Sequence, residues 1–126
     1  MKLRITGNSL RLRLSRSELA RFLDGSRIEE TIRFTPVREA KFSYALDSAV
    51  QSSPIRVQYE AQQVTVILSR DRAAIWGLEN EVGVYGTLDC GEGSLEISVE
   101  KDFACLDRSD EENKDTFTNP HANSAC

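Results

Sequence analysis

The sequence predicts a mainly β protein of the α+β class, in which two ββαββ segments form a single compact, pseudo-symmetric barrel. Three observations support this prediction. Strand-like alternation recurs along the chain, two short helices begin at serines, and the same order of elements returns 54 residues later. At 126 residues, 40% of them hydrophobic, the chain suits one domain with its own core. We expect that domain at 1–103, with repeats at about 2–46 and 56–100.

A β-hairpin opens the first segment. Residues 2–6 and 9–14 alternate polar and apolar side chains, which is typical of half-buried strands. Gly7-Asn8 between them suits a two-residue turn, because both residues tolerate positive φ. The alternation places apolar residues inward (Leu3, Ile5, Leu10, Leu12 and Leu14) and puts Arg11 and Arg13 on the opposite face.

A short helix follows this hairpin. Ser15 is a candidate N-cap, and Glu18, three residues later, completes a capping box. An apolar stripe continues to Leu23, and Gly25 can end the helix in a left-handed cap. The helix has only two to three turns, so packing against the rest of the domain must hold it in place.

The other elements repeat this plan. Alternation predicts strands at 27–34, 41–46, 55–59, 64–68, 82–88 and 95–99, and Ser69 caps a helix that runs to about residue 78. Residues 47–54 form a polar connector, and Ala61-Gln62 is a plausible turn. The expected inward residues include Ile28, Ile32, Phe34, Phe42, Tyr44, Leu46, Ile55, Val57, Tyr59, Val64, Val66 and Leu68, with Trp76 in the core.

The two segments align at an offset of 54 residues. Leu14-Ser15-Arg16 falls on Leu68-Ser69-Arg70, Phe22 on Trp76, and Ile28 on Val82. Identities are few, so shared binary patterning is the alternative explanation. The matching helix starts and element lengths favour duplication. Two such halves would bury their apolar faces against each other, as a monomer with an internal pseudo-dimer.

Charge is distributed unevenly along the chain. The net charge is −4, yet residues 1–46 carry ten basic and five acidic side chains. Residues 47–103 carry four basic and ten acidic ones. One half therefore suits an anionic partner. No apolar run long enough for a membrane span and no signal-peptide core is present, so we expect a cytoplasmic protein without membrane contact.

Gly7-Asn8-Ser9, followed by Leu12-Arg13-Leu14 and a short capped helix, resembles the AbrB/MazE-type swapped-hairpin barrel. In that family Pro-Lys commonly stands where this chain has Ser15-Arg16. Family members are usually homodimers of ββαββ units, so the resemblance implies both units in one polypeptide. It also implies DNA contact by the first hairpin, through Arg4, Asn8, Ser9 and Arg13, with Arg11 as an added basic neighbour.

The second segment weakens that implication. It carries Gln58, Ala61, Gln62, Gln63 and Ile67 at the corresponding positions, so a symmetric basic face is lost. Asn8 and Ser9 also suit a purely structural role in the turn, and exposed arginines often do no more than face the solvent.

Over its whole length the chain also resembles a family of small uncharacterised bacterial proteins. The likeness rests on the start Met1-Lys2-Leu3-Arg4-Ile5, on the segment Glu100 to Leu106, and on an acidic tail with Asn119-Pro120-His121. This resemblance implies no activity and no cofactor.

The segment 104–126 reads as a flexible, acidic tail that we expect to be disordered, although Leu106 and Phe117 suit docking. We expect a non-enzymatic binding or regulatory module, with nucleic acid or an unknown protein as its partner. An antitoxin-like module acting through the tail is the alternative. A metal site at Cys105, His121 and Cys126, or an enzyme centred on Asp102, Cys105 and His121, ranks last, because these spacings match no compact site.

Overall fold

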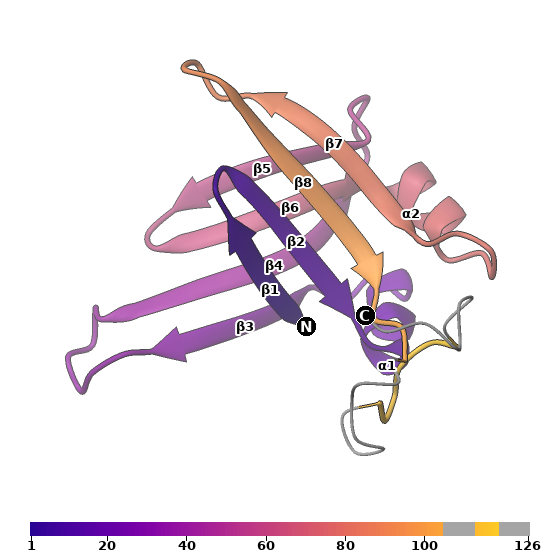
Figure 1. Ribbon diagram of the computed structural model, residues 1–126, viewed down its shortest axis with the longest axis horizontal. Coiled ribbons are helices and arrows are strands. Elements are labelled where there is room, and N and C mark those ends of the chain that lie inside the picture. The colour runs from indigo at the N-terminus through magenta and orange to yellow at the C-terminus, as the bar shows by residue number, and fades with distance from the viewer. Residues whose placement is uncertain (105–112, 119–126) are drawn as a thin grey trace.

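A computed structural model describes residues 1–104 and 113–118, and within these residues it contains eight strands and two helices. The mainly β prediction is confirmed, and each predicted element is present (Figure 1). In chain order the elements are β1 (Lys2–Thr6), β2 (Ser9–Leu14), α1 (Arg16–Leu23), β3 (Ile28–Arg33), β4 (Lys41–Ala49), β5 (Ile55–Glu60), β6 (Gln63–Ser69), α2 (Arg70–Trp76), β7 (Gly83–Asp89) and β8 (Ser94–Lys101).

The strands form two four-stranded sheets. Sheet A has the order β1-β2-β8-β7, and sheet B has the order β3-β4-β6-β5. Each sheet combines two strands from the first half of the chain with two from the second. The central pairs, β2–β8 and β4–β6, are parallel, and the other pairs are antiparallel. Hairpins from the two halves are therefore interleaved.

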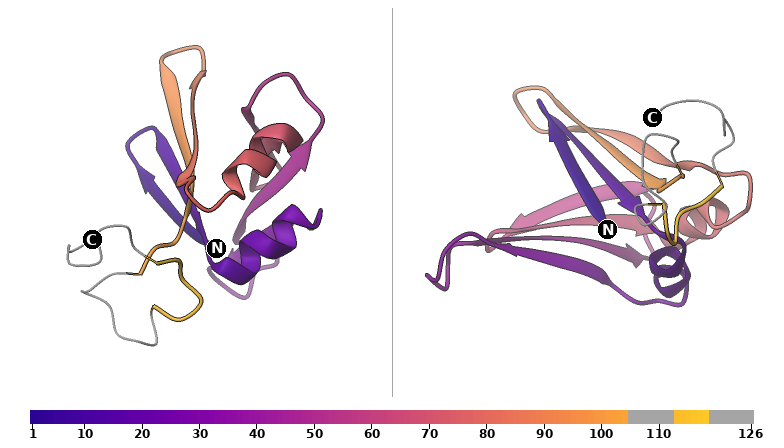
Figure 2. Two further views of the ribbon diagram at one scale, coloured as in Figure 1. Left: turned by 90° about the vertical axis from the view of Figure 1, so that its right-hand side faces the viewer. Right: turned by 60° about the horizontal axis from the view of Figure 1, so that its bottom comes forward.

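The two sheets do not close into a barrel, so that part of the prediction is wrong. They meet along β5 and β7, where a Cβ added to Gly86 would lie 2.2 Å from Cγ2 of Ile55. A side chain packed on the backbone occupies this junction, and no hydrogen-bonded ladder crosses it in the described chain. From the end that holds the helices the sheets diverge toward the hairpin tips (Figure 2).

The core lies where the sheets converge beneath the helices. Leu14, Leu46 and Leu68 are fully buried there, as predicted, and so is Val99. Trp76 is also fully buried, and its ring meets Phe22 edge to face at 6.1 Å, so the two helices share one packing contact.

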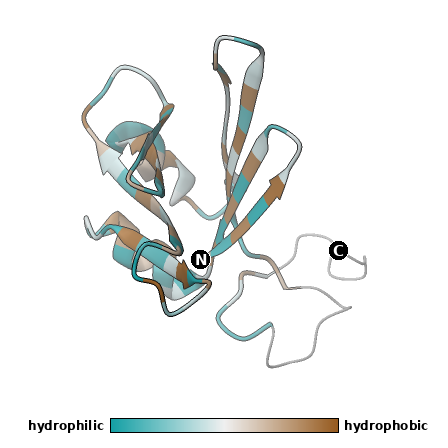
Figure 3. Ribbon diagram, turned by 90° about the vertical axis from the view of Figure 1, so that its left-hand side faces the viewer, coloured by the Kyte–Doolittle hydropathy of each residue, from teal (hydrophilic) through white to brown (hydrophobic). Residues whose placement is uncertain are grey.

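Several apolar residues near the hairpin tips are exposed, which corrects the expectation that they point into a closed core. Ile5 is 59% exposed and Tyr59 is 68% exposed. The reason is the divergence of the sheets, which leaves these strand ends without a facing layer (Figure 3). Ile32 and Phe34, toward the β3–β4 turn, belong to the same group. Val82 is also exposed, but it lies in the connection between α2 and β7.

The local signals for α1 are confirmed. Ser15 accepts the N–H of Glu18, and the Glu18 carboxylate accepts the N–H of Ser15 at 2.9 Å, which completes the capping box. Gly25, with φ of +98°, follows the helix, and Ser26 N–H donates to the Arg21 carbonyl in a Schellman pattern. Together these contacts define both ends of the helix.

The turns of the β1–β2 and β5–β6 hairpins differ from each other. In the first, Gly7 takes positive φ (+55°) and Asn8 does not. In the second, Ala61 and Gln62 both take positive φ, at +52° and +60°. The weaker sequence signal therefore marks the turn with the stricter backbone requirement.

Part of the segment expected to be a tail is docked on the domain. Phe117 N–H donates to the Asp102 carbonyl at 2.8 Å, and the rings of Phe117 and Phe103 meet at 6.2 Å. Cys105, Leu106, His121 and Cys126 lie outside the described residues, as do residues 107–112. No helix in the described chain has the length and apolarity that a bilayer span requires.

Candidate functional site

Four cationic side chains gather on the outer surface of the β1–β2 hairpin. We call Lys2, Arg4, Arg11 and Arg13 the cationic face. The register pairs Lys2 with Arg13 and Arg4 with Arg11, so all four point away from the core in two cross-strand pairs. A shallow hollow of about 190 Å³ lies among them and Leu3.

The neighbouring strand β8 supplies a carboxylate to this face. Arg11 Nε lies 3.2 Å from Oε1 of Glu100. The hydroxyl of Tyr85 on β7 donates to Oε2 of the same carboxylate at 2.7 Å. Glu100 therefore balances the charge of Arg11, while Tyr85 donates to the second oxygen of the Glu100 carboxylate. A phosphate would have to compete with this carboxylate for Arg11.

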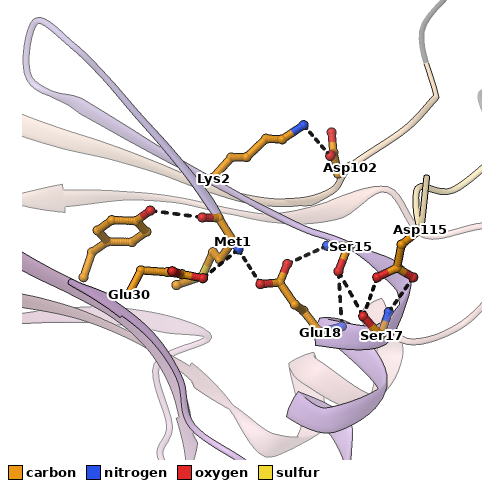
Figure 4. Close-up of polar contacts among 9 residues, drawn as sticks. Met1, Lys2, Ser15, Ser17, Glu18, Glu30, Asp102 and Asp115 are labelled. Atoms are coloured by element: carbon orange, nitrogen blue, oxygen red, sulfur yellow. Dashed lines mark hydrogen bonds and ion pairs between the residues drawn. The ribbon is translucent and has the colours of Figure 1, made fainter. Parts of the chain in front are cut away.

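Lys2 is also paired. Its Nζ lies 2.8 Å from Oδ2 of Asp102, a residue that is almost fully buried (Figure 4). Arg4 and Arg13 have no carboxylate partner within residues 1–104 and 113–118. These two guanidinium groups therefore carry the charge of the cationic face that is available to an anion.

Asn8 and Ser9 are engaged in structure. Asn8 Nδ2 donates to the carbonyl of Ser94 at 2.8 Å, which ties the first turn to the tip of the β7–β8 hairpin. The Ser9 hydroxyl donates to the carbonyl of Thr6 at 2.5 Å, within its own turn. Of the five residues predicted to contact nucleic acid, the three arginines share one face, and Asn8 and Ser9 support it from its end.

The amino group of Met1 anchors β1 to the helix. It forms an ion pair with Glu18 and another with Glu30 at 3.2 Å, and the Tyr44 hydroxyl donates to the Met1 carbonyl at 3.0 Å (Figure 4). Burial opposes ionisation of Glu18, but the hydrogen bonds from Met1 and Ser15 outweigh it and lower its pKa. This network fixes the end of the strand that carries Lys2 and Arg4.

Residues 113–118 pack against the start of α1. Asp115 accepts the N–H of Ser17 at 3.1 Å and also the Ser17 hydroxyl, and its carbonyl accepts the N–H of Arg16 at 2.9 Å (Figure 4). These bonds lower the Asp115 pKa, chiefly the one from the Ser17 hydroxyl. The Arg16 guanidinium lies 5.1 Å from the centre of the Phe117 ring. The segment thus satisfies amides at the helix N-terminus.

Sequence reasoning missed both networks, because each joins residues far apart in the chain. The capping box was visible, but nothing in the sequence shows that Glu18 also receives the Met1 amine. Asp115 takes φ of +61°, and Asp is one of the few non-glycine residues that often do so. That preference for a turn is a weak signal that sequence analysis had available.

A model of a family of unknown function (DUF7009) matches residues 1–121 of the chain. The chain therefore belongs to this family, which agrees with the whole-length resemblance to uncharacterised proteins. No curated protein and no solved structure matches the chain.

Proposed function

We propose that this protein is a non-enzymatic binding module that holds the phosphate backbone of a nucleic acid on its cationic face. The observation that carries the proposal is the clustering of four cations on one edge hairpin, two of them without a carboxylate partner in the described chain. Phosphate contacts by arginine supply most of the affinity in sequence-independent binding.

We further propose that the chain is a duplicated relative of the AbrB/MazE-type barrels, with both ββαββ units in one polypeptide. The strand order supports this. Replacing each strand by its counterpart in the other half turns β1-β2-β8-β7 into β5-β6-β4-β3, which is sheet B. Hairpins from one unit pair with strands of the other, as a swapped arrangement requires.

The register of the parallel pairs gives independent support. Ser9 pairs with Glu96 in sheet A, and Gln63 pairs with Ser43 in sheet B. Gln63 lies 54 residues after Ser9, and Ser43 lies 53 residues before Glu96, so both members of the pair are shifted along the chain by nearly the same number of residues. Binary patterning alone does not require this agreement.

One part of the proposed alignment needs a correction. In sheet B, Ile28 pairs with Leu46. The counterpart of Leu46 in sheet A is Val99, 53 residues later, and Val99 pairs with Val84. Val84 is buried like Ile28, whereas Val82 is partly exposed. The counterpart of Ile28 is therefore Val84, and the connection after α2 holds two more residues than the one after α1.

In this proposal the chain acts as a cytoplasmic monomer that presents one cationic hairpin and has no second, symmetric one. A single face with two available arginines implies weak binding. The antitoxin-like alternative would act through the tail, most of which lies outside the described residues, and the described part of that segment contacts its own domain.

The test is a fluorescence-anisotropy titration of a labelled oligonucleotide at low salt with the full chain. We expect the double variant Arg4→Gln/Arg13→Gln to bind at least tenfold more weakly, because two charge-assisted contacts are lost. The matched control is Arg21→Gln/Arg33→Gln, which removes the same charge from exposed residues elsewhere. An equal loss in both variants, or no binding by wild type at about 10⁻⁴ M, would refute the proposal.

A further inference from the structure

The outer surface of sheet A continues beyond the cationic face to an exposed aromatic ring. Arg4, Arg11, Ser98 and Tyr85 lie in one row across β1, β2, β8 and β7, each opposite the next in register. Residues opposite one another point to the same side of a sheet, so the Tyr85 ring shares the surface of the arginines. Neighbouring strands are about 4.8 Å apart, which places Tyr85 about 10 Å from Arg11.

The Tyr85 ring is both available and held in place. Its side of the sheet is open, and the residue is 53% exposed. The hydroxyl is fixed by its bond to Glu100, which is in turn held by Arg11. Burial and the bond to Glu100 raise the Tyr85 pKa to about 12, so the hydroxyl keeps the proton that it donates to Glu100. An exposed ring with a fixed orientation is a suitable platform for stacking.

We propose that this surface binds a single-stranded nucleic acid, with Arg4 and Arg13 on its phosphates and Tyr85 stacked on a base. The inference rests on the proposed function and names the class of nucleic acid. In a duplex the bases already stack on one another and offer no free face to a tyrosine. In a single strand every base has a free face. Proteins that bind single strands commonly stack an aromatic side chain on that face, beside cationic side chains that contact the phosphates.

The carboxylates of the same surface favour a single strand as well. Glu96 and Ser9 are opposite one another in register, and Glu100 and Arg13 are likewise opposite, so negative charge flanks the arginines. A duplex carries two phosphates for each base-pair step and would meet stronger repulsion than one strand. Among the described residues, two arginines without carboxylate partners suit a short run of widely spaced phosphates.

The experiment compares a labelled ten-nucleotide oligothymidylate with a duplex of the same length at low salt. We expect wild type to bind the single strand at least fivefold more tightly than the duplex. Replacement Tyr85→Leu should remove this preference, because it keeps apolar bulk and β-propensity but loses the π-face. Tyr85→Phe should retain at least half of the single-strand affinity, since the ring remains.

The matched control is Tyr59→Leu, because Tyr59 is also exposed but lies on the other sheet. This substitution should leave both affinities unchanged. Thermal unfolding of each variant shows whether it is folded. Equal affinities for the two nucleic acids, or an unchanged single-strand affinity in Tyr85→Leu, would overturn this inference. If the loss in Arg4→Gln/Arg13→Gln persists in that case, the proposed function still stands. Absence of binding by wild type would refute both.

Discussion

The hairpins β1–β2 and β5–β6 occupy equivalent places, each at one edge of its sheet, and they are alike on the inner surface but different on the outer one. Their inner surfaces agree: Leu14 and Leu68 end β2 and β6 and are both fully buried. Their outer surfaces do not agree. Where β1–β2 presents Lys2, Arg4, Arg11 and Arg13, the register of β5–β6 presents Arg56, Gln58, Thr65 and Ile67.

The β6 part of this outer surface is also covered, because Thr65 and Ile67 are buried, whereas Gln58 on β5 is exposed. Arg27 donates to Thr65 at 3.1 Å, and the Gln51 amide donates to the carbonyl of Ile67 at 3.1 Å while its oxygen accepts from Arg56 at 2.6 Å. The fold requires apolar inner residues in both hairpins and leaves the outer residues free to diverge. The outer residues of β6 serve packing, whereas Arg4 and Arg13 on β1–β2 have no carboxylate partner among the described residues.

The largest expected effect tests the equality of the inner surfaces. Leu14→Ala and Leu68→Ala should each lower the free energy of unfolding by about 2–5 kcal/mol, as other fully buried leucines do. Denaturant titration of both variants measures this. We expect the two losses of unfolding free energy to agree within about 1 kcal/mol, because both leucines are fully buried. A small loss at one site would mean that the two hairpins do not share one core.

A reciprocal exchange tests the difference between the outer surfaces. Ile67→Arg should destabilise the protein by about 2 kcal/mol or more, because Ile67 is buried and a charge there loses its hydration. Arg13 is half-buried and has no carboxylate partner among the described residues, so Arg13→Ile should change stability by no more than about 1 kcal/mol. Equal effects in chemical denaturation would show that the two surfaces are equally open.

The two helix starts give a smaller, pH-dependent contrast. Glu18 completes the cap of α1, while Arg72 holds the same position in α2, where Ser69 caps alone. Because folding lowers the Glu18 pKa, its stabilisation is complete above the unfolded value and is lost as pH falls through the folded one. Glu18→Gln should cost about 1.5 kcal/mol at pH 7.

The check is thermal or urea unfolding at several pH values between 7 and 3. The stability difference between wild type and Glu18→Gln should shrink below about pH 4.5. Arg72→Gln is the control and should show no change over that interval. A Glu18→Gln deficit that stays constant down to pH 3 would contradict the role of the ionised carboxylate.

The smallest expected effect concerns Arg11. Its ion pair with Glu100 is partly exposed, so Arg11→Ala should alter stability by no more than about 0.5–1 kcal/mol. The same change should weaken nucleic-acid binding less than Arg4→Gln or Arg13→Gln alone, since Glu100 already engages Arg11. Binding titrations of the three single variants compare them, and an equal loss for Arg11→Ala would show that the ion pair opens on binding.

Local chemistry made most of the fold predictable. Ser15, Glu18 and Gly25 determine the ends of α1 through contacts within a few residues, and alternation located all eight strands of the described chain. Closure of the sheets was not predictable in the same way. Alternation shows which face of a strand is apolar, and it does not show whether another layer lies opposite that face. Ile5 and Tyr59 were therefore placed in a core that does not reach them.

The cationic face was predictable because Arg11 and Arg13 alternate with leucines on one strand. Which of its charges are available was not. Glu100 and Asp102 reach Arg11 and Lys2 from the far end of the chain, through the parallel pairing of β2 with β8. The position of Tyr85 beside the arginines depends on the same long-range pairing. A binding surface made by two halves of a chain is visible only when their register is known.

The most direct test of the account is NMR mapping of the bound surface. Backbone amide shifts would be followed in ¹⁵N-labelled protein during titration with the oligothymidylate. The account predicts that the largest changes fall on residues 2–13 of β1–β2 and on 83–87 and 96–100 of β7 and β8, with the amides of β5–β6 unmoved. Changes centred on β5–β6, or none at saturating oligonucleotide, would contradict it.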